Sequence, residues 1–307
     1  MSHDLPPPYY ASVATLEAEQ RDIASLIRQL SQDIVKADQN FNDVRTLLQG
    51  KFGAEVAPPS LKDNWRGHRQ VFINMIWDAR RAATSVESRN QNFLEVILPL
   101  IGDAGKSKES KISLLEKFCA KPLPEFLTST ESTDKVRGID SAIPDLLKVY
   151  EENADKLIDS SNTEIVRLEA ERDKQKEREE AAKEKEKDKK SSSSWFSSRP
   201  TSHPGTAFYS TSEVTNRVSK IEAINKQRNE LKSTLADIRF ALNTIPDQVG
   251  QSFLTVWTHL TNDATHLKNR LGGSTSDPMP DLPAVTRVYR EINSALKYYA
   301  TNVSKTG

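Results

Sequence analysis

The segment from Leu100 to Ser107 ends in the Gly-Lys-Ser triplet that phosphate-binding loops carry, and it follows an apolar run. A loop of this kind needs another glycine at the position of Leu100, because successive backbone N–H groups must wrap around the phosphates. The run before it also has the spacing of a helix that contains Pro99, and not the pattern of a strand. We therefore interpret the segment as a helix end followed by a loop, and we expect no nucleotide or other cofactor.

Histidine, cysteine and carboxylate side chains are frequent metal ligands and catalytic groups, but they form no recognisable motif in this chain. The two histidines nearest to each other, His259 and His266, are seven residues apart, which is too far to share a metal ion within one helix. Cys119 is the only cysteine and stands beside Phe118 in a short amphipathic stretch, so we expect it to be a small buried apolar side chain. No His-Glu-x-x-His or Gly-x-Ser-x-Gly motif occurs. We expect no catalytic residue, no metal site and no enzyme.

A proline-rich stretch near the start of the chain matches a known ligand pattern. Its residues Pro6, Pro7, Pro8 and Tyr9 form the Pro-Pro-x-Tyr motif that WW domains bind. Such segments are already extended as polyproline II, so they lose little entropy on docking, and the tyrosine fills a second pocket. This interpretation predicts a WW-domain partner, and the alternative is a proline-rich tail without a partner.

Aromatic side chains also gather among the serines of residues 191–212, next to a lysine cluster that ends at Lys190. These aromatic residues are Trp195, Phe196, Phe208 and Tyr209. Aromatic rings beside lysines are typical of segments that contact the interface of a membrane. The alternative is a flexible polar loop whose rings cap a helical hairpin.

The composition favours long helices over a compact globule. Of the 307 residues, 36% are hydrophobic, 28% are charged and 7% are aromatic, as in bundles whose helices bury one stripe each. The 43 basic residues balance the 43 acidic ones, so we expect no nucleic-acid partner. A single cysteine, the lack of a signal-peptide pattern and the lack of a membrane-spanning apolar run together predict a cytoplasmic protein.

Heptad spacing predicts the first two long helices. Between residues 12 and 50, apolar side chains recur at steps of three and four with one gap: Leu16, Ile23, Ile27, Leu30, Ile34, Ala37, Phe41, Val44 and Leu48. Ser60 and Asp63 match a capping box and predict a second long helix, which continues to Leu100. Because the connection is short, these helices should be antiparallel neighbours.

A short helix is expected over residues 111–120, and a third long helix should begin near Thr133. Pro144 should kink this helix or restart it. Its apolar seam ends at Leu168, whereas charged residues that favour helix continue to Lys190. The second part of this helix therefore has no apolar seam, and it should be either a solvated single helix or a frayed one.

A fourth long helix should begin at a second capping box, formed by Ser210 and Glu213. Its heptad pattern continues past Pro246, where we expect a kink, as far as Leu271. A last helix should begin after Asp281, where an acidic cap precedes an apolar stripe.

Residues 191–212 join the charged run to the fourth helix, so we expect a helical hairpin there. Folding it about Thr201 places Leu168 near Thr234, and the seam of residues 214–231 then faces the charged run. That seam would need another partner, which is either the first two helices or another chain. The residues that we assign to partner binding on this seam are Val214, Val218, Ile221 and Ile224.

These patterns predict an all-α fold: an elongated antiparallel helical bundle or coiled coil of four long helices and two shorter ones, with one loose charged hairpin end. We expect a proline-rich flexible arm over residues 1–11 and the bundle over residues 12–304, with the charged helix and serine-rich tip at residues 169–212. The leading hypothesis is a non-enzymatic cytoplasmic scaffold that binds partner proteins, or further copies of itself, through heptad helix surfaces and the Pro-Pro-x-Tyr arm. The alternative is a membrane-active or membrane-shaping bundle that acts through residues 191–212, and in size and architecture it resembles the cytolysin-A-like α-helical toxins.

Overall fold

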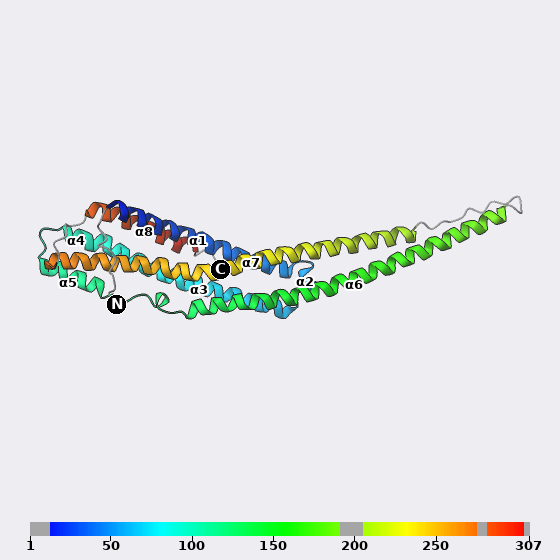
Figure 1. Ribbon diagram of the computed structural model, residues 1–307, viewed down its shortest axis with the longest axis horizontal. Coiled ribbons are helices and arrows are strands. Elements are labelled where there is room, and N and C mark those ends of the chain that lie inside the picture. Colours follow the sequence, from blue (N-terminus) through cyan, green and yellow to red (C-terminus); the bar gives the residue numbers. More distant parts are fainter. Residues whose placement is uncertain (1–12, 191–204, 275–280, 304–307) are drawn as a thin grey trace, which may run out of the picture. The chain divides into compact units, whose positions relative to one another are not determined.

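The computed structural model describes residues 13–190, 205–274 and 281–303, and every regular element in these ranges is a helix (Figure 1). The four long helices are α1 Val13–Gln49, α3 Pro59–Asn92, α6 Glu131–Lys190 and α7 Gly205–Gly272. The shorter elements are α2 Gly53–Val56, a π-helical turn Phe93–Ile97, α4 Leu98–Gly102, α5 Lys108–Cys119, a 3-10 turn Glu125–Leu127 and α8 Leu282–Val303. The all-α helical bundle expected from the sequence is confirmed.

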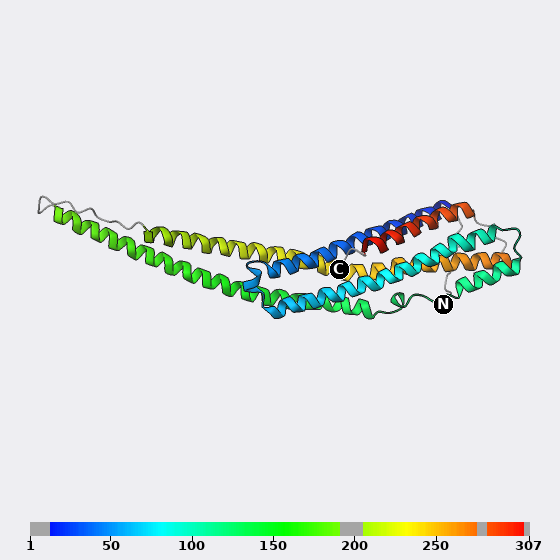
Figure 2. The same cartoon turned by 180° about the vertical axis from the view of Figure 1, so that it is seen from behind.

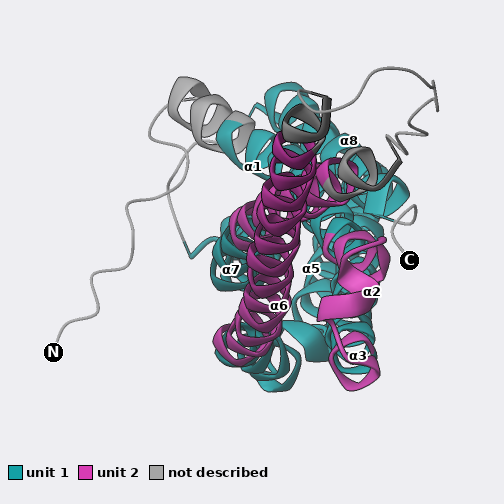
Figure 3. Ribbon diagram, turned by 90° about the vertical axis from the view of Figure 1, so that its right-hand side faces the viewer, with its two compact units in different colours: residues 1–43, 63–143, 235–307 teal, residues 44–62, 144–234 magenta. Residues whose placement is uncertain are grey.

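The chain divides into two compact units, which Figure 3 draws in different colours. Unit 1 consists of residues 1–43, 63–143 and 235–307, and unit 2 consists of residues 44–62 and 144–234. The helices α1, α3, α6 and α7 each contribute one part to unit 1 and another part to unit 2. Each unit therefore buries a core of its own, built from segments that are distant in the sequence.

In unit 1, α1 packs against α3 along the predicted heptad seam. The ring of Phe41 stacks on the rings of Trp65 and Phe72, each with its centroid 4.9 Å away. Trp65 Nε1 donates a hydrogen bond to the Phe41 carbonyl (3.0 Å), so the polar atom of this buried indole is satisfied. Nearby, Arg69 donates hydrogen bonds of 3.1 and 2.9 Å to Asp38 Oδ1. Stacking and the ion pair hold the two helices in one alignment.

Helix α8 completes the core of unit 1. Its buried side chains recur at steps of three and four from Ala284 to Val303. Arg28 of α1 lies 3.6 Å from Glu291, and Asn302 Nδ2 donates a hydrogen bond to Ser31 Oγ (2.9 Å). These contacts place α8 beside α1, as Figures 1 and 2 show from opposite sides.

Polar side chains inside unit 1 connect α8 to α3 and α7. Asn90 is fully buried, and its Nδ2 donates a hydrogen bond to the Tyr289 carbonyl (2.8 Å). The hydroxyl of Tyr289 donates in turn to Asp263 Oδ2 (2.5 Å). Since a buried polar group without a partner is costly, these bonds favour one arrangement of the three helices.

In unit 2, α6 and α7 form an antiparallel pair whose register follows from ion pairs. With the α6 residue first, the pairs are Glu151–Lys232 (2.5 Å), Asp155–Arg228 and Glu164–Arg217 (3.9 Å). Continuing the pairing of Glu164 with Arg217 by four residues along both antiparallel helices puts Leu168 opposite Glu213. The prediction that the hairpin folds about Thr201 and brings Leu168 near Thr234 is therefore wrong. The seam of α7 faces residues 151–168, which have apolar side chains of their own, and not the charged run.

Residues 44–62 pack against the same part of α7. Lys220 Nζ lies 2.6 Å from Glu55 Oε2, and Gln227 Nε2 donates a hydrogen bond to the Leu47 carbonyl. These contacts agree with the first of the two alternatives for this seam, packing on the first two helices, and pairing with another chain stays a prediction.

Two of the predicted helix starts are wrong. The second long helix begins at Pro59 and not after a cap at Ser60. Proline suits a first turn, because it has no N–H group to leave unpaired and its φ is already helical. Helix α7 begins at Gly205, five residues before the predicted cap at Ser210.

Internal prolines do not interrupt the long helices. Both α6 and α7 continue through Pro144 and Pro246, so Pro144 does not restart a helix, and the expected kinks stay predictions. Helix α7 ends with Gly273 in the left-handed region (φ 81°), and the next N–H group, of Ser274, donates to the Asn269 carbonyl (2.9 Å). This is the hydrogen bond of a glycine C-cap, which a residue with a side chain would strain.

The charged run forms a solvent-exposed part of α6. All residues from 176 to 185 are exposed, and the helix predicted there is confirmed. Its polar composition leaves nothing to bury, so charged side chains remain in water on every face. None of the helices in the described ranges has the length and apolar character that crossing a membrane requires.

Candidate partner-binding site

Several of the predicted binding residues lie outside the residues that the structure describes. These are Pro6, Pro7, Pro8 and Tyr9 of the proline-rich motif, and Trp195 and Phe196 of the serine-rich segment. The backbone of Phe208 and Tyr209 belongs to α7, but the description does not extend to their side chains. The WW-domain and membrane assignments of these residues stay predictions.

The four predicted partner-binding residues of α7 differ in their exposure. Ile224 is 0% exposed inside unit 2 and is not available to a partner. Val214 and Ile221 are half-buried, and Val218 is 42% exposed. The surface of this seam is thus reduced to one exposed valine and the edges of two other side chains.

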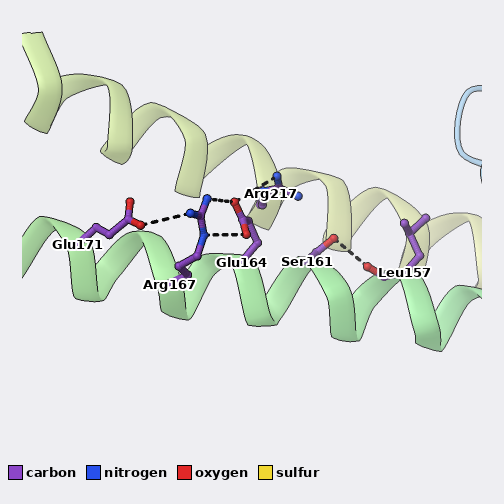
Figure 4. A network of polar contacts seen from close by, with 6 residues as sticks. All are labelled: Leu157, Ser161, Glu164, Arg167, Glu171 and Arg217. Carbon is purple, nitrogen blue, oxygen red and sulfur yellow. Dashed lines mark hydrogen bonds and ion pairs between the residues drawn. The ribbon is translucent and has the colours of Figure 1, made fainter.

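Exposed ion pairs cover the α6 side of the same stretch (Figure 4). Arg167 Nε donates to Glu164 Oε2 (3.0 Å), and Arg167 Nη1 donates to Glu171 Oε1 (3.2 Å). Arg217 approaches Glu164 from α7. The hydrogen bond from Arg167 lowers the pKa of Glu164, so this carboxylate is charged near neutral pH. Val166, 66% exposed, lies beside Arg167 in the sequence, so this surface mixes an apolar side chain with paired charges.

The large apolar side chain with the greatest exposure in the described residues is Phe240 of α7, at 73%. It borders a groove of about 140 Å³ between α1 and α7 in unit 1. The groove is lined by Asp33, Lys36, Ala37 and Asn40 of α1 and by Asp237, Phe240, Ala241, Thr244, Ile245 and Gln248 of α7. Covering the exposed part of this ring would contribute about 2 kcal/mol to a complex.

Two further exposed apolar side chains lie outside the groove lining, on the same two helices. Leu26, 57% exposed, precedes Asp33 of α1 by seven residues. Leu254, 40% exposed, follows Phe240 by fourteen residues. Steps of seven return to the same face of a helix, so these leucines share helix faces with the groove residues. Together with Phe240 they form the groove row, a set of three apolar side chains along α1 and α7.

Charges of both signs line the groove. Asp33 and Asp237 are acidic and Lys36 is basic. Gln29 Nε2 donates a hydrogen bond to Asp33 Oδ1 (2.9 Å), which holds this carboxylate on the rim. No single sign of charge dominates, so the groove has little to attract a polyanion over long distances.

A larger open cavity of about 660 Å³ lies between α3 and the start of α6, also in unit 1. Its charged groups are engaged with one another. Asp78 forms an ion pair with Arg81 and accepts a hydrogen bond from Ser132 Oγ (3.1 Å). Lys135 Nζ lies 2.7 Å from Glu131. Because these charges are paired, the cavity offers no uncompensated group that would select a ligand.

The Gly-Lys-Ser segment forms a helix cap and not a phosphate loop. Ser107 Oγ accepts a hydrogen bond from Ser110 N (3.3 Å) at the start of α5. Asp103 Oδ1 accepts from Gly105 N (2.8 Å), so a carboxylate already occupies a backbone N–H that a phosphate would need. Among the described residues, no group of three or more His, Cys, Asp or Glu side chains is arranged to hold a metal ion.

Sequence reasoning missed the groove row, although a signal for it exists. Phe240 stands between the seam positions Ile238 and Leu242, so it cannot belong to the same buried stripe. A large apolar side chain off the seam is the pattern that identifies such a surface. Comparison of the chain with models of known protein families, with curated proteins and with solved structures finds no match.

Proposed function

We propose that this chain is a non-enzymatic scaffold that binds an amphipathic helix of a partner protein in the groove between α1 and α7. The observation that supports the proposal is Phe240, whose ring is 73% exposed on the rim of that groove. Helices bind grooves through apolar side chains spaced three, four and seven residues apart. The groove row places apolar side chains along α1 and α7, where the apolar side chains of a partner helix with this spacing can contact them.

The size and charge of the groove favour a helix over other ligands. Its volume of about 140 Å³ suits single side chains of a partner, whereas pockets for small molecules usually have about 300–1,000 Å³. Its mixed charges would gain little from an anionic membrane or a nucleic acid. Asp33 and Lys36 on the rim can instead pair with charges that flank the apolar face of a partner helix.

Two further elements of the proposal rest on the sequence. The Pro-Pro-x-Tyr motif supplies a second contact, to a WW-domain protein, and Tyr9→Ala should abolish binding of an isolated WW domain. The single cysteine suits a reducing compartment and so favours the cytoplasm as the place where the scaffold acts.

The test uses a photoreactive amino acid, p-benzoylphenylalanine, at position 240 of the full chain in cells that naturally make it. The matched control carries the same amino acid in place of Leu123, which is also an exposed apolar residue of unit 1 (36%) but lies outside the groove. We expect one discrete protein adduct from position 240 and none of that mass from position 123. Adding Leu26→Asp, a change on the surface of the groove row, should remove the adduct without unfolding the protein.

The absence of an adduct from position 240, or the same adduct from both positions, would contradict the proposal. An adduct between two copies of the chain would identify self-association as the use of the groove. Liposome co-sedimentation with and without residues 185–212 tests the membrane-active alternative separately. Lipid binding that requires these residues, together with no adduct at position 240, would favour that alternative.

A further inference from the structure

Arg89 of α3 is a buried guanidinium inside unit 1, with 1% of its surface exposed. Aromatic rings from two other helices lie against it. The guanidinium carbon is 4.2 Å from the ring centroid of Phe118 in α5 and 4.1 Å from that of Trp257 in α7. Such cation–π contacts recover part of the hydration that the guanidinium loses on burial.

The hydrogen bonds of this guanidinium are incomplete. Nη2 donates to Thr261 Oγ1 (2.9 Å), whereas Nε and Nη1 have no acceptor. Burial lowers the pKa of Arg89 to about 10, because the apolar surroundings disfavour the charged form. Within the described part of the chain, Arg89 forms no ion pair with a carboxylate. A buried cation that lacks a counter-ion is costly, so the site would be stabilised by an anion.

Cys119 shares the surroundings of Arg89. It stands next to Phe118 at the end of α5 and is partly exposed. Its Sγ lies 3.5 Å from Thr265 Oγ1 and 3.9 Å from the carbonyl of Thr261, whose hydroxyl accepts the hydrogen bond from Arg89. A negative charge on Cys119 raises the pKa of Arg89, whereas burial lowers it. Both side chains therefore contact Thr261, and the thiol has access to solvent that the guanidinium lacks.

We propose that Cys119 is a redox-sensitive modification site, at which hydrogen peroxide oxidises the sulfur and Arg89 is the counter-ion of the sulfur anion. The thiolate is the form of a cysteine that reacts with peroxide, and Arg89 is the nearby cation that would pair with the charged sulfur. The thiolate attacks one peroxide oxygen, so an S–O bond forms while the O–O bond breaks. The leaving hydroxide takes up a proton and departs as water. The sulfur loses two electrons to the peroxide, and the product is a sulfenic acid, whose ionised form is a sulfenate.

The sulfenate supplies what the site lacks. Its oxygen carries negative charge and lone pairs that accept hydrogen bonds from Nε or Nη1 of Arg89. Oxidation of a buried side chain usually destabilises a core, because it adds a polar group without a partner. At Cys119 the partner is already present, so oxidised unit 1 should be more stable than reduced unit 1.

The test measures how fast Cys119 reacts with hydrogen peroxide in the full chain, with the sulfenic acid trapped by dimedone and the adduct detected by mass spectrometry. The matched control combines Cys119→Ser with Ser113→Cys, which moves the only thiol to an exposed position of the same helix. We expect the parent thiol to react about tenfold faster than the thiol at position 113. Arg89→Met, which keeps a side chain against both rings, should remove this difference.

A parent rate no higher than the control rate would overturn the proposal, and this comparison does not depend on how Arg89→Met folds. An unchanged rate in Arg89→Met would overturn it as well. The second readout is the melting temperature after treatment with one equivalent of peroxide. It should rise by a few degrees in the parent and not in Arg89→Met, and a fall in the parent would refute the stabilising role of the sulfenate.

Discussion

Replacing Ile224 and Val218, each by alanine, tests whether the seam of α7 in unit 2 is filled by the chain itself. Ile224 is 0% exposed and Val218 is 42% exposed. Ile224→Ala removes three carbons from a closed site, which costs about 2.4 kcal/mol at about 0.8 kcal/mol per carbon, and the cavity raises the cost to about 3 kcal/mol. Val218→Ala removes two carbons that are partly hydrated already, so its cost should be about 1 kcal/mol or less.

Hydrogen exchange measured by mass spectrometry is the suitable assay, because it reports the opening of unit 2 separately from that of unit 1. The peptides to follow cover residues 212–234 of α7. A loss of about 3 kcal/mol in Ile224→Ala should accelerate exchange there on the order of a hundredfold, since about 1.4 kcal/mol corresponds to a factor of ten. Val218→Ala should accelerate exchange by less than about tenfold.

Equal effects of the two substitutions would refute the packing of this seam within the chain. A second chain as the partner of the seam predicts a different result, because the protection of these peptides would then fall as the protein is diluted. Measurements at two protein concentrations distinguish these cases, and we expect the exchange rates to be the same at both.

Three further substitutions test local features of the two units. Gly53→Ala should destabilise unit 2 by about 2 kcal/mol in urea unfolding, because a Cβ there would overlap the Leu47 carbonyl oxygen. Asp38→Ala should cost about 3 kcal/mol in the same assay, because it leaves Arg69, whose side chain is 20% exposed, without its carboxylate; Asp38→Leu combined with Arg69→Met should recover most of the loss. Burial lowers the pKa of His259 from 6.5 to about 4, so the unfolded chain binds a proton between these pH values and the folded chain does not. The stability contribution of neutral His259 is complete above pH 6.5 and falls by about 2 kcal/mol toward pH 4 once its partial exposure is allowed for. In His259→Gln, the free energy of unfolding should therefore vary less with pH over that range.

The existence and type of the helices followed from the sequence, because the spacing of apolar residues is itself the condition for burying one face. Helix ends were less predictable. A capping box consists of two common residue types, and a chain rich in serine, threonine and glutamate contains it by chance, as at Ser60 and Ser210. At Pro59 a competing rule decides the start, since a proline at the first turn needs no cap for its missing N–H group.

The two sites differ in how far the sequence could have revealed them. Phe240 departs from the seam of its own helix, so the pattern of α7 alone indicates an exposed ring. Arg89 carries no such signal, because an arginine on a helix is ordinarily solvated. Its burial depends on Phe118 and Trp257, which belong to helices far away in the sequence. The reaction proposed for Cys119 could therefore not be derived before the helices were placed.

The error in the hairpin register has a geometric cause. The ion pairs put Glu213 opposite Leu168, whereas the predicted residue was Thr234, and these two positions lie 21 residues, or three whole heptads, apart. A shift by whole heptads returns the apolar positions of α7 to the seam. Hydrophobic spacing consequently specifies which side chains are buried but not which turns of the two helices face each other.

The charged neighbours of the seam distinguish the registers. In the observed register Arg228 meets Asp155, whereas a shift of 21 positions would put Val249 in its place and leave the carboxylate unpaired. One exposed ion pair contributes only about 0–1 kcal/mol, so no single pair decides the register. The pairs at Glu151 and Glu164 would be lost in the same shift, and their effects act in the same direction. Information about the register of this hairpin therefore resides in the polar residues that flank the heptad positions, where charges select partners in coiled coils.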